Sequence, residues 1–72
     1  MENDILTQFG SRVKELRIKN KLTQEQFAQK IGLHKNYIGM VERGERNPSL
    51  VNIQIIANGL NVTISELMKF LV

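Results

Sequence analysis

Apolar residues recur along the chain at steps of three and four, the spacing that places side chains on one face of an α-helix. The first row of this kind holds four residues: Ile5, Phe9, Val13 and Leu16. It predicts a helix over residues 4–19, which Asn3 or Asp4 can cap. No stretch alternates apolar and polar residues for long enough to predict a strand.

A second and a third helix follow at once, and both are short. Residues 23–26, Thr-Gln-Glu-Gln, fit a capping box that opens a helix over residues 23–31, and Gly32 suits the positive φ at its end. The third helix is expected over residues 35–43, and Gly44 ends it. The apolar residues expected to pack between these two helices are Phe27, Ala28, Ile31, Ile38 and Val41.

The remaining pattern predicts two more helices. Ser49 caps the fourth helix after Pro48, and Asn61 suits a left-handed stop at its end. Its inward row is expected to contain Leu50, Ile53, Ile56, Ala57 and Leu60. Residues 63–66, Thr-Ile-Ser-Glu, fit a second capping box that opens a fifth helix running to about residue 71. The chain is therefore predicted to be all-α, with five short helices.

Only Gly32-Leu33-His34 joins the second helix to the third, and so short a turn forces a steep angle between them. With the apolar row inward, five residues remain on the outward face of the third helix: Lys35, Asn36, Gly39, Met40 and Arg43. A helix about 10–12 Å wide fits a DNA major groove about 12 Å wide. Gln24, at the start of the second helix, would then lie over the phosphate backbone, where a helix N-terminus favours anions.

Length and composition limit what else the chain does. Its 72 residues make one domain with a small core, and without Cys it has neither a disulfide nor a thiolate. A single His argues against a zinc site and against a Ser–His–Asp arrangement. We therefore expect no enzyme activity, no metal, no cofactor and no small-molecule ligand. The formal charge of +3 favours an anionic partner only weakly.

No segment predicts secretion or membrane insertion. Residues 1–4 are acidic and lack the positive n-region of a signal peptide. No apolar run approaches the length of a membrane span. We therefore expect a cytoplasmic protein with no membrane partner.

Many spaced positions together resemble the helix-turn-helix domain of phage-repressor and Cro-type regulators. The matching residues lie within about residues 9–68 and are Thr23, Gln24, Phe27, Ala28, Gly32, Leu33, Ile38, Glu42, Gly44, Pro48, Ile53, Ile56, Ala57, Leu60 and Val62. Within that family the chain looks most like the controller proteins of restriction–modification systems, which share its Tyr37-Ile38, Val41-Glu42-Arg43 and Arg46-Asn47. The resemblance implies a compact five-helix, lambda-repressor-like domain over residues 1–72, with its helix-turn-helix core at about 23–43.

The resemblance also implies roles in binding double-stranded DNA. Lys35 and Asn36 would read base edges, since Lys donates to guanine and Asn pairs with adenine. Gln24 would bind phosphate. The residues implied along the backbone or the groove edge are Thr23, Tyr37, Arg43, Arg46 and Asn47. Arg17 and Glu42 would form a partly buried ion pair.

Three positions depart from the family's pattern and bear on the target sequence rather than on the mode of binding. His34 stands where Ser, Thr or Asp usually caps the third helix, which predicts a weak cap. Gly39 stands where a small polar reader is common. Met40 stands where some relatives carry a polar reader, and it suits a thymine methyl instead.

The last helix carries more apolar surface than so short a helix can bury against a small core. We expect a two-fold homodimer through the helix at about 64–71, with these interface residues: Ile64, Leu67, Met68 and Leu71, together with Val72. Such a dimer would present two copies of the third helix about 34 Å apart. The predicted operator is a near-palindrome with half-site centres about ten base pairs apart.

Other interpretations fit the same residues. Lys35, Asn36 and Arg43 also suit an ordinary solvated helix face, and Tyr37 also suits packing against the second helix. An antitoxin or another protein-interaction module uses the same scaffold, as does another small phage-type repressor. RNA binding is less favoured, because one Tyr and three Phe supply no stacking platform at exposed spacing.

Overall fold

The structure, a computed structural model, describes residues 4–71. Within that range every regular element is helical, in the order α1 Asp4–Lys19, α2 Gln24–Ile31, α3 Lys35–Glu42, α4 Leu50–Gly59, α5 Ile64–Leu67 and the 3-10 helix η1 Lys69–Leu71. The predicted all-α class and the five helices are confirmed. Asn3 and Val72, named above as a cap and an interface residue, lie outside the described residues. None of the helices in this range is long and apolar enough to cross a membrane.

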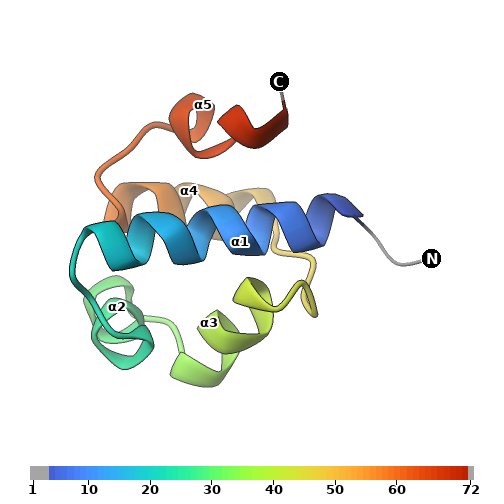
Figure 1. Ribbon diagram of the computed structural model, residues 1–72. Coiled ribbons are helices and arrows are strands. Elements are labelled where there is room, and N and C mark those ends of the chain that lie inside the picture. The colour runs from blue at the N-terminus through green and yellow to red at the C-terminus, as the bar shows by residue number, and fades with distance from the viewer. Residues whose placement is uncertain (1–3, 72) are drawn as a thin grey trace.

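Helix α1 runs through the middle of the molecule, and the other helices pack around it (Figure 1). On one side of α1 lie α2 and α3, with α3 in contact with both α1 and α2. On the opposite side lie α5 and η1, where α5 contacts α4 and η1 contacts α1. The segment expected to bind DNA and the segment expected to form a dimer are therefore on opposite sides of α1.

The turns between helices form as the sequence predicts. The Thr23 hydroxyl accepts the backbone N–H of Gln26 at 3.0 Å, and the Gln26 side chain accepts the N–H of Thr23 at 2.9 Å, which completes the capping box. Gly32 adopts the left-handed conformation, with φ 74°, at the end of α2. Asn61 does the same after α4, with φ 61°.

The fifth helix is shorter than predicted. The Thr63 hydroxyl accepts the backbone N–H of Glu66 at 3.0 Å, but the Glu66 carboxylate lies 3.5 Å from the ammonium of Lys69 rather than completing a box. The α-helix ends at Leu67 and the chain tightens into η1. The expectation of one continuous helix to residue 71 is wrong, because Met68 caps α5 and Leu71 then donates to the Met68 carbonyl at 3.0 Å, the three-residue spacing of a 3-10 turn.

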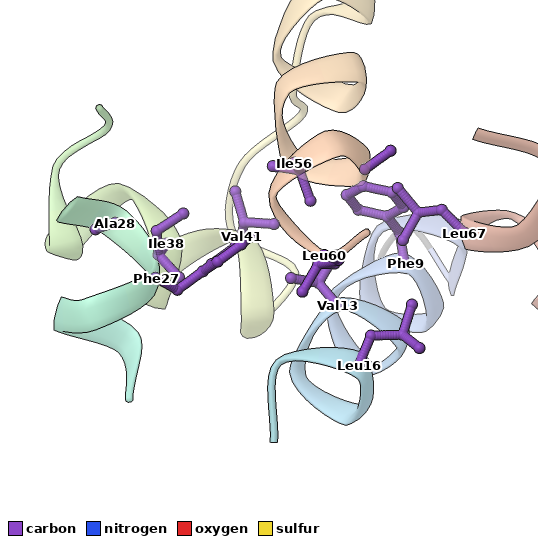
Figure 2. Packing of buried hydrophobic residues seen from close by; sticks show 11 residues of the cluster. Phe9, Val13, Leu16, Phe27, Ala28, Ile38, Val41, Ile56, Leu60 and Leu67 are labelled. Atoms are coloured by element: carbon purple, nitrogen blue, oxygen red, sulfur yellow. The ribbon is translucent and has the colours of Figure 1, made fainter. Parts of the chain in front are cut away.

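The core lies between α1, α4 and α5 and continues between α2 and α3 (Figure 2). Its buried apolar residues are Phe9, Val13, Leu16, Phe27, Ala28, Ile38, Val41, Ile56, Ala57, Leu60 and Leu67. Ile5 and Leu50, which the sequence assigned to inward rows, are 47% and 73% exposed. Both assignments are wrong, because each residue stands in the first turn of its helix, beyond the edge of the core.

Helices α1 and α3 cross with their backbones almost touching at Gly10. A Cβ atom at this position would lie 2.6 Å from the carbonyl oxygen of Glu42 and would also collide with that of Val41. No side chain larger than hydrogen fits there without moving a backbone. Gly10 therefore fixes the C-terminal end of α3 against α1.

Candidate nucleic-acid interface

The α2–α3 pair is a helix-turn-helix with a three-residue turn. Gly32 donates its N–H to the carbonyl of Ala28, and Leu33 donates to the same carbonyl at 3.0 Å. Ala28 is buried at the point where α3 packs on α2, as expected for a small residue between two helices. These contacts set the angle at which α3 leaves α2 and present one side of α3 to solvent.

His34 caps α3, although the sequence suggested a weak cap. Its Nδ1 accepts the backbone N–H of Asn36 at 3.1 Å, and its backbone is extended, as at other helix N-caps. A ring nitrogen can accept only when it carries no proton, so the neutral ring holds its proton on Nε2. The imidazole replaces the hydroxyl or carboxylate usual at such positions.

A groove opens between the start of α2 and the exposed side of α3. Its lining residues are Arg17, Thr23, Gln24, Glu25, Lys35, Asn36, Gly39, Met40 and Arg43. Seven of the ten residues predicted to contact DNA are in this set, so the structure brings most of the predicted site together. Lys35 and Asn36 are exposed at the N-terminal end of α3, whereas Met40 is partly buried. The exposed Asn47 lies in the loop before α4.

The sequence predicted that Gly39 lies on the exposed surface of α3, and this prediction is wrong. It is buried, and a Cβ atom there would be 3.2 Å from a terminal nitrogen of Arg43 and 3.6 Å from the side-chain oxygen of Gln24. The missing side chain leaves room for those two polar side chains to lie over the helix. Gly39 forms the floor of the groove rather than part of its exposed wall.

A buried ion pair supports the groove from beneath. Arg17 donates from Nε to one Glu42 oxygen at 2.7 Å and from Nη2 to the other at 3.1 Å, and the two side chains are 10% and 2% exposed. Arg17 also donates to the carbonyl of Leu22 at 2.7 Å. The ion pair implied by the resemblance is confirmed, and its fork geometry is the strong, specific one for guanidinium and carboxylate.

Gln24 is hydrogen-bonded to this ion pair. Its amide nitrogen donates to Glu42 at 2.9 Å, so that carboxylate accepts three N–H groups from two side chains. The bond fixes which end of the Gln24 amide faces inward. The side-chain oxygen of Gln24 then lies over Gly39, at the floor of the groove.

Two acidic residues at this surface were missed by the sequence reasoning. Glu45 accepts from Nε of Arg43 at 3.1 Å, and both side chains are more than half exposed. The hydrogen bond and the charge of Glu45 raise the pKa of Arg43 above its usual value, so Arg43 stays cationic. Glu25 lines the groove beside Gln24. In the sequence, Glu45 stands between Arg43 and Arg46, and this alternation of charge could have indicated an acidic residue among the basic ones.

Tyr37, Arg46 and Asn52 form a second cluster beside the groove. The Tyr37 hydroxyl accepts from the Asn52 side-chain nitrogen at 3.1 Å. The Arg46 guanidinium carbon lies 5.1 Å from the centroid of the Tyr37 ring, within the range of a cation–π contact. Sequence reasoning did not select Asn52, although a polar residue between Val51 and Ile53 in an otherwise apolar stretch was a signal.

At the opposite side of the molecule, Leu67 is fully buried in the chain's own core. Its prediction as a subunit-interface residue is wrong, because Leu67 anchors α5 in the core that residues of α1 and α4 share. Ile64 and Met68 are half-buried against the same core, and Leu71 is 54% exposed. Two residues of α4, Leu50 and Val51, are also exposed, at 73% and 68%.

Residues 13–67 match the model of the helix-turn-helix family, and the chain belongs to this family of phage-repressor and Cro-type regulators. Control protein C.MunI from Mycoplasma sp is 48% identical over 68 residues, which cover 93% of this chain and 92% of that protein. Relatives of this kind are regulators and repressors, so the family is not one of enzymes.

Two solved structures show the same fold. The restriction-modification controller protein C.AhdI from Aeromonas hydrophila has a TM-score of 0.85 and 48% sequence identity, covering 88% of this chain and 96% of that one. C.Esp1396I, a restriction-modification controller protein solved as a tetramer with its natural 35 base-pair operator, has a TM-score of 0.88 and 30% identity, covering 97% and 92%. The resemblance to controller proteins is confirmed.

Proposed function

We propose that the chain is a sequence-specific regulator of transcription that binds double-stranded DNA and controls a restriction–modification system. It acts without catalysis, as a homodimer on a near-palindromic operator. The supporting observation is the groove of the α2–α3 pair, with exposed Lys35 and Asn36 beside a Gln24 whose amide is held by buried Glu42. The similarity to controller proteins over nearly the whole chain supports the same proposal.

The residues divide into two roles in this proposal. Lys35 and Asn36 read base edges from the N-terminal end of α3, and Met40 contacts a thymine methyl. The residues that position the protein on phosphate are Thr23, Gln24, Tyr37, Arg43, Arg46 and Asn47. Gly39 supports them by leaving space for Gln24 and Arg43.

Dimerisation is proposed through the side of the molecule opposite the groove. Leu71 is exposed there and Ile64 and Met68 are partly so. From α5 through η1 the chain runs back toward the end where α4 begins (Figure 1), and the exposed Leu50 and Val51 stand at that end of α4. Together these residues offer the apolar surface that a two-fold interface needs.

Selection from random duplex DNA, followed by gel-shift measurement at two salt concentrations, tests the DNA proposal. We expect a near-palindromic site with half-site centres about ten base pairs apart, and affinity that falls steeply with salt. An antitoxin-like module would select no sequence. Binding without salt dependence would contradict the proposal.

Sedimentation tests the dimer. Leu71→Asp and Val51→Asp each place a charge on the proposed interface and are expected to give folded monomers that bind the full operator no better than a half-site. Ile18→Asp is the matched control, because Ile18 is an exposed apolar residue, 56% exposed, on α1. Folded variants that all remain dimeric would exclude this surface.

A further inference from the structure

The hydrogen bond between Asn52 and Tyr37 joins the first turn of α4 to α3. Asn52 donates from its side-chain nitrogen to the Tyr37 hydroxyl at 3.1 Å, and both side chains are partly buried. Asn52 is itself held, because its backbone N–H donates to the Ser49 hydroxyl at 3.1 Å as part of the α4 cap. The Tyr37 ring also packs against the core. The hydroxyl group is therefore fixed from two sides.

The direction of this bond decides what Tyr37 can do next. A phenol has one proton to donate and an oxygen that accepts. Since Asn52 donates to that oxygen, the Tyr37 proton is not used in the bond and is available to an outside acceptor. Phosphate oxygens are acceptors only, so the arrangement suits a DNA backbone.

Arg46 is held by the same ring. Its guanidinium carbon lies 5.1 Å from the ring centroid, and a guanidinium stacked on an aromatic face keeps its N–H groups at its edges. The side chain is otherwise exposed, on a loop that connects α3 to α4. Fixing the ring therefore also limits where the Arg46 charge can lie.

We propose that Asn52 is a positioning residue for DNA binding, which acts through Tyr37 and Arg46 rather than by touching DNA. It orients the Tyr37 hydroxyl as a phosphate donor and keeps the ring where Arg46 stacks on it. This inference rests on the proposed function. It predicts a loss of affinity that is the same for every DNA sequence, because the cluster contributes no base reader.

A double-mutant cycle tests it, with operator affinity measured for wild type, Asn52→Ala, Tyr37→Phe and the double variant. We expect Asn52→Ala to weaken binding roughly three- to tenfold, the effect of losing one hydrogen bond. In the Tyr37→Phe background the same change should have no further effect, because the hydroxyl is already absent. The control is Asn58→Ala on the same helix, whose exposed side chain accepts a hydrogen bond from Gln54, and it should bind like wild type.

Asn52→Asp tests the direction of the bond. A carboxylate can only accept, so it would take the Tyr37 proton that the phosphate needs. Binding should weaken more than in Asn52→Ala, and part of this extra loss should disappear in the Tyr37→Phe background. All variants are compared at a temperature where circular dichroism shows them folded.

Additive losses from Asn52→Ala and Tyr37→Phe would overturn the inference, since they would mean that Asn52 acts independently of Tyr37. A loss confined to particular bases would overturn it as well. Both outcomes leave the proposed function intact, because that function is tested separately, by site selection and salt dependence of the wild-type chain.

Discussion

The α2–α3 pair and the C-terminal α5–η1 segment are both short, but the structure holds them in different ways. Buried Glu42 accepts bonds from Arg17 and Gln24, so polar groups fix the groove from beneath. On the other side, α5 is held by buried Leu67 and by one bond from Arg12 to the Glu66 carbonyl at 2.8 Å. A surface that must place hydrogen-bond donors needs directional support, whereas a surface for apolar association needs only a packed anchor.

The largest effect is expected at Glu42, where the polar support is removed. Glu42→Ala leaves the buried Arg17 guanidinium without its partner, which is expected to lower the free energy of unfolding by about 3–5 kcal/mol. Urea unfolding followed by circular dichroism measures this loss. Glu45→Ala, which removes an exposed carboxylate, should change stability by no more than about 0.5 kcal/mol. Equal stability of the two variants would contradict the role of the buried pair.

At the C-terminal segment the contrast lies between two leucines. Leu67→Ala empties a fully buried position and is expected to cost about 2–5 kcal/mol of unfolding free energy. Leu71→Ala removes a side chain that is 54% exposed, so the chain should remain nearly as stable while its dimer weakens. Thermal unfolding at several protein concentrations separates the two effects. Similar stability losses at both positions would show that Leu71 belongs to the core.

A smaller effect, on DNA affinity, is expected to distinguish base-reading residues from phosphate-binding residues on the groove side of the molecule. Lys35→Ala and Asn36→Ala should each relax base preference at one or two operator positions, by about 1–3 kcal/mol. Arg46→Ala should instead weaken all sequences alike and reduce the salt slope by about one. Binding across an operator library, repeated at several salt concentrations, gives both quantities. Identical profiles for the three variants would show that the assignment of roles is wrong.

The smallest effect concerns the cap of α3. His34→Ala removes the acceptor for the Asn36 N–H and is expected to lower stability by about 1 kcal/mol. His34→Ser restores a hydroxyl that can accept the same N–H, so its stability should match wild type. Chemical unfolding of the three proteins provides the comparison. A serine variant as unstable as the alanine variant would mean that the imidazole does not act as a cap.

Local features of the fold could be predicted because they depend on neighbours in sequence. The Thr23 box, Gly32 and Asn61 form as expected, since each requires only residues within one turn. The Arg17–Glu42 pair joins α1 to α3, and no spacing rule finds it. The family resemblance supplied that pair.

Features that depend on distant elements could not be predicted in the same way. Helix α4 has apolar residues on several faces, so periodicity did not show that Leu50 is exposed. Leu67 was assigned to the wrong surface for a related reason, because composition shows how much apolar surface exists but not which neighbour covers it. The bond between Asn52 and Tyr37 spans two helices, and nothing in either segment alone indicates it.

The close contact at Gly10 also determines how this scaffold could be redesigned for a new target. Exchanging exposed residues such as Lys35 and Asn36 changes the chemistry presented to the bases while α3 keeps its orientation. A side chain at residue 10 would press on the carbonyl groups of Val41 and Glu42, from the face of α3 that packs on α1. Such a change would tilt α3 as a rigid body and alter every contact of the groove together. Residue 10 is therefore the position to hold constant in any library meant to vary specificity alone.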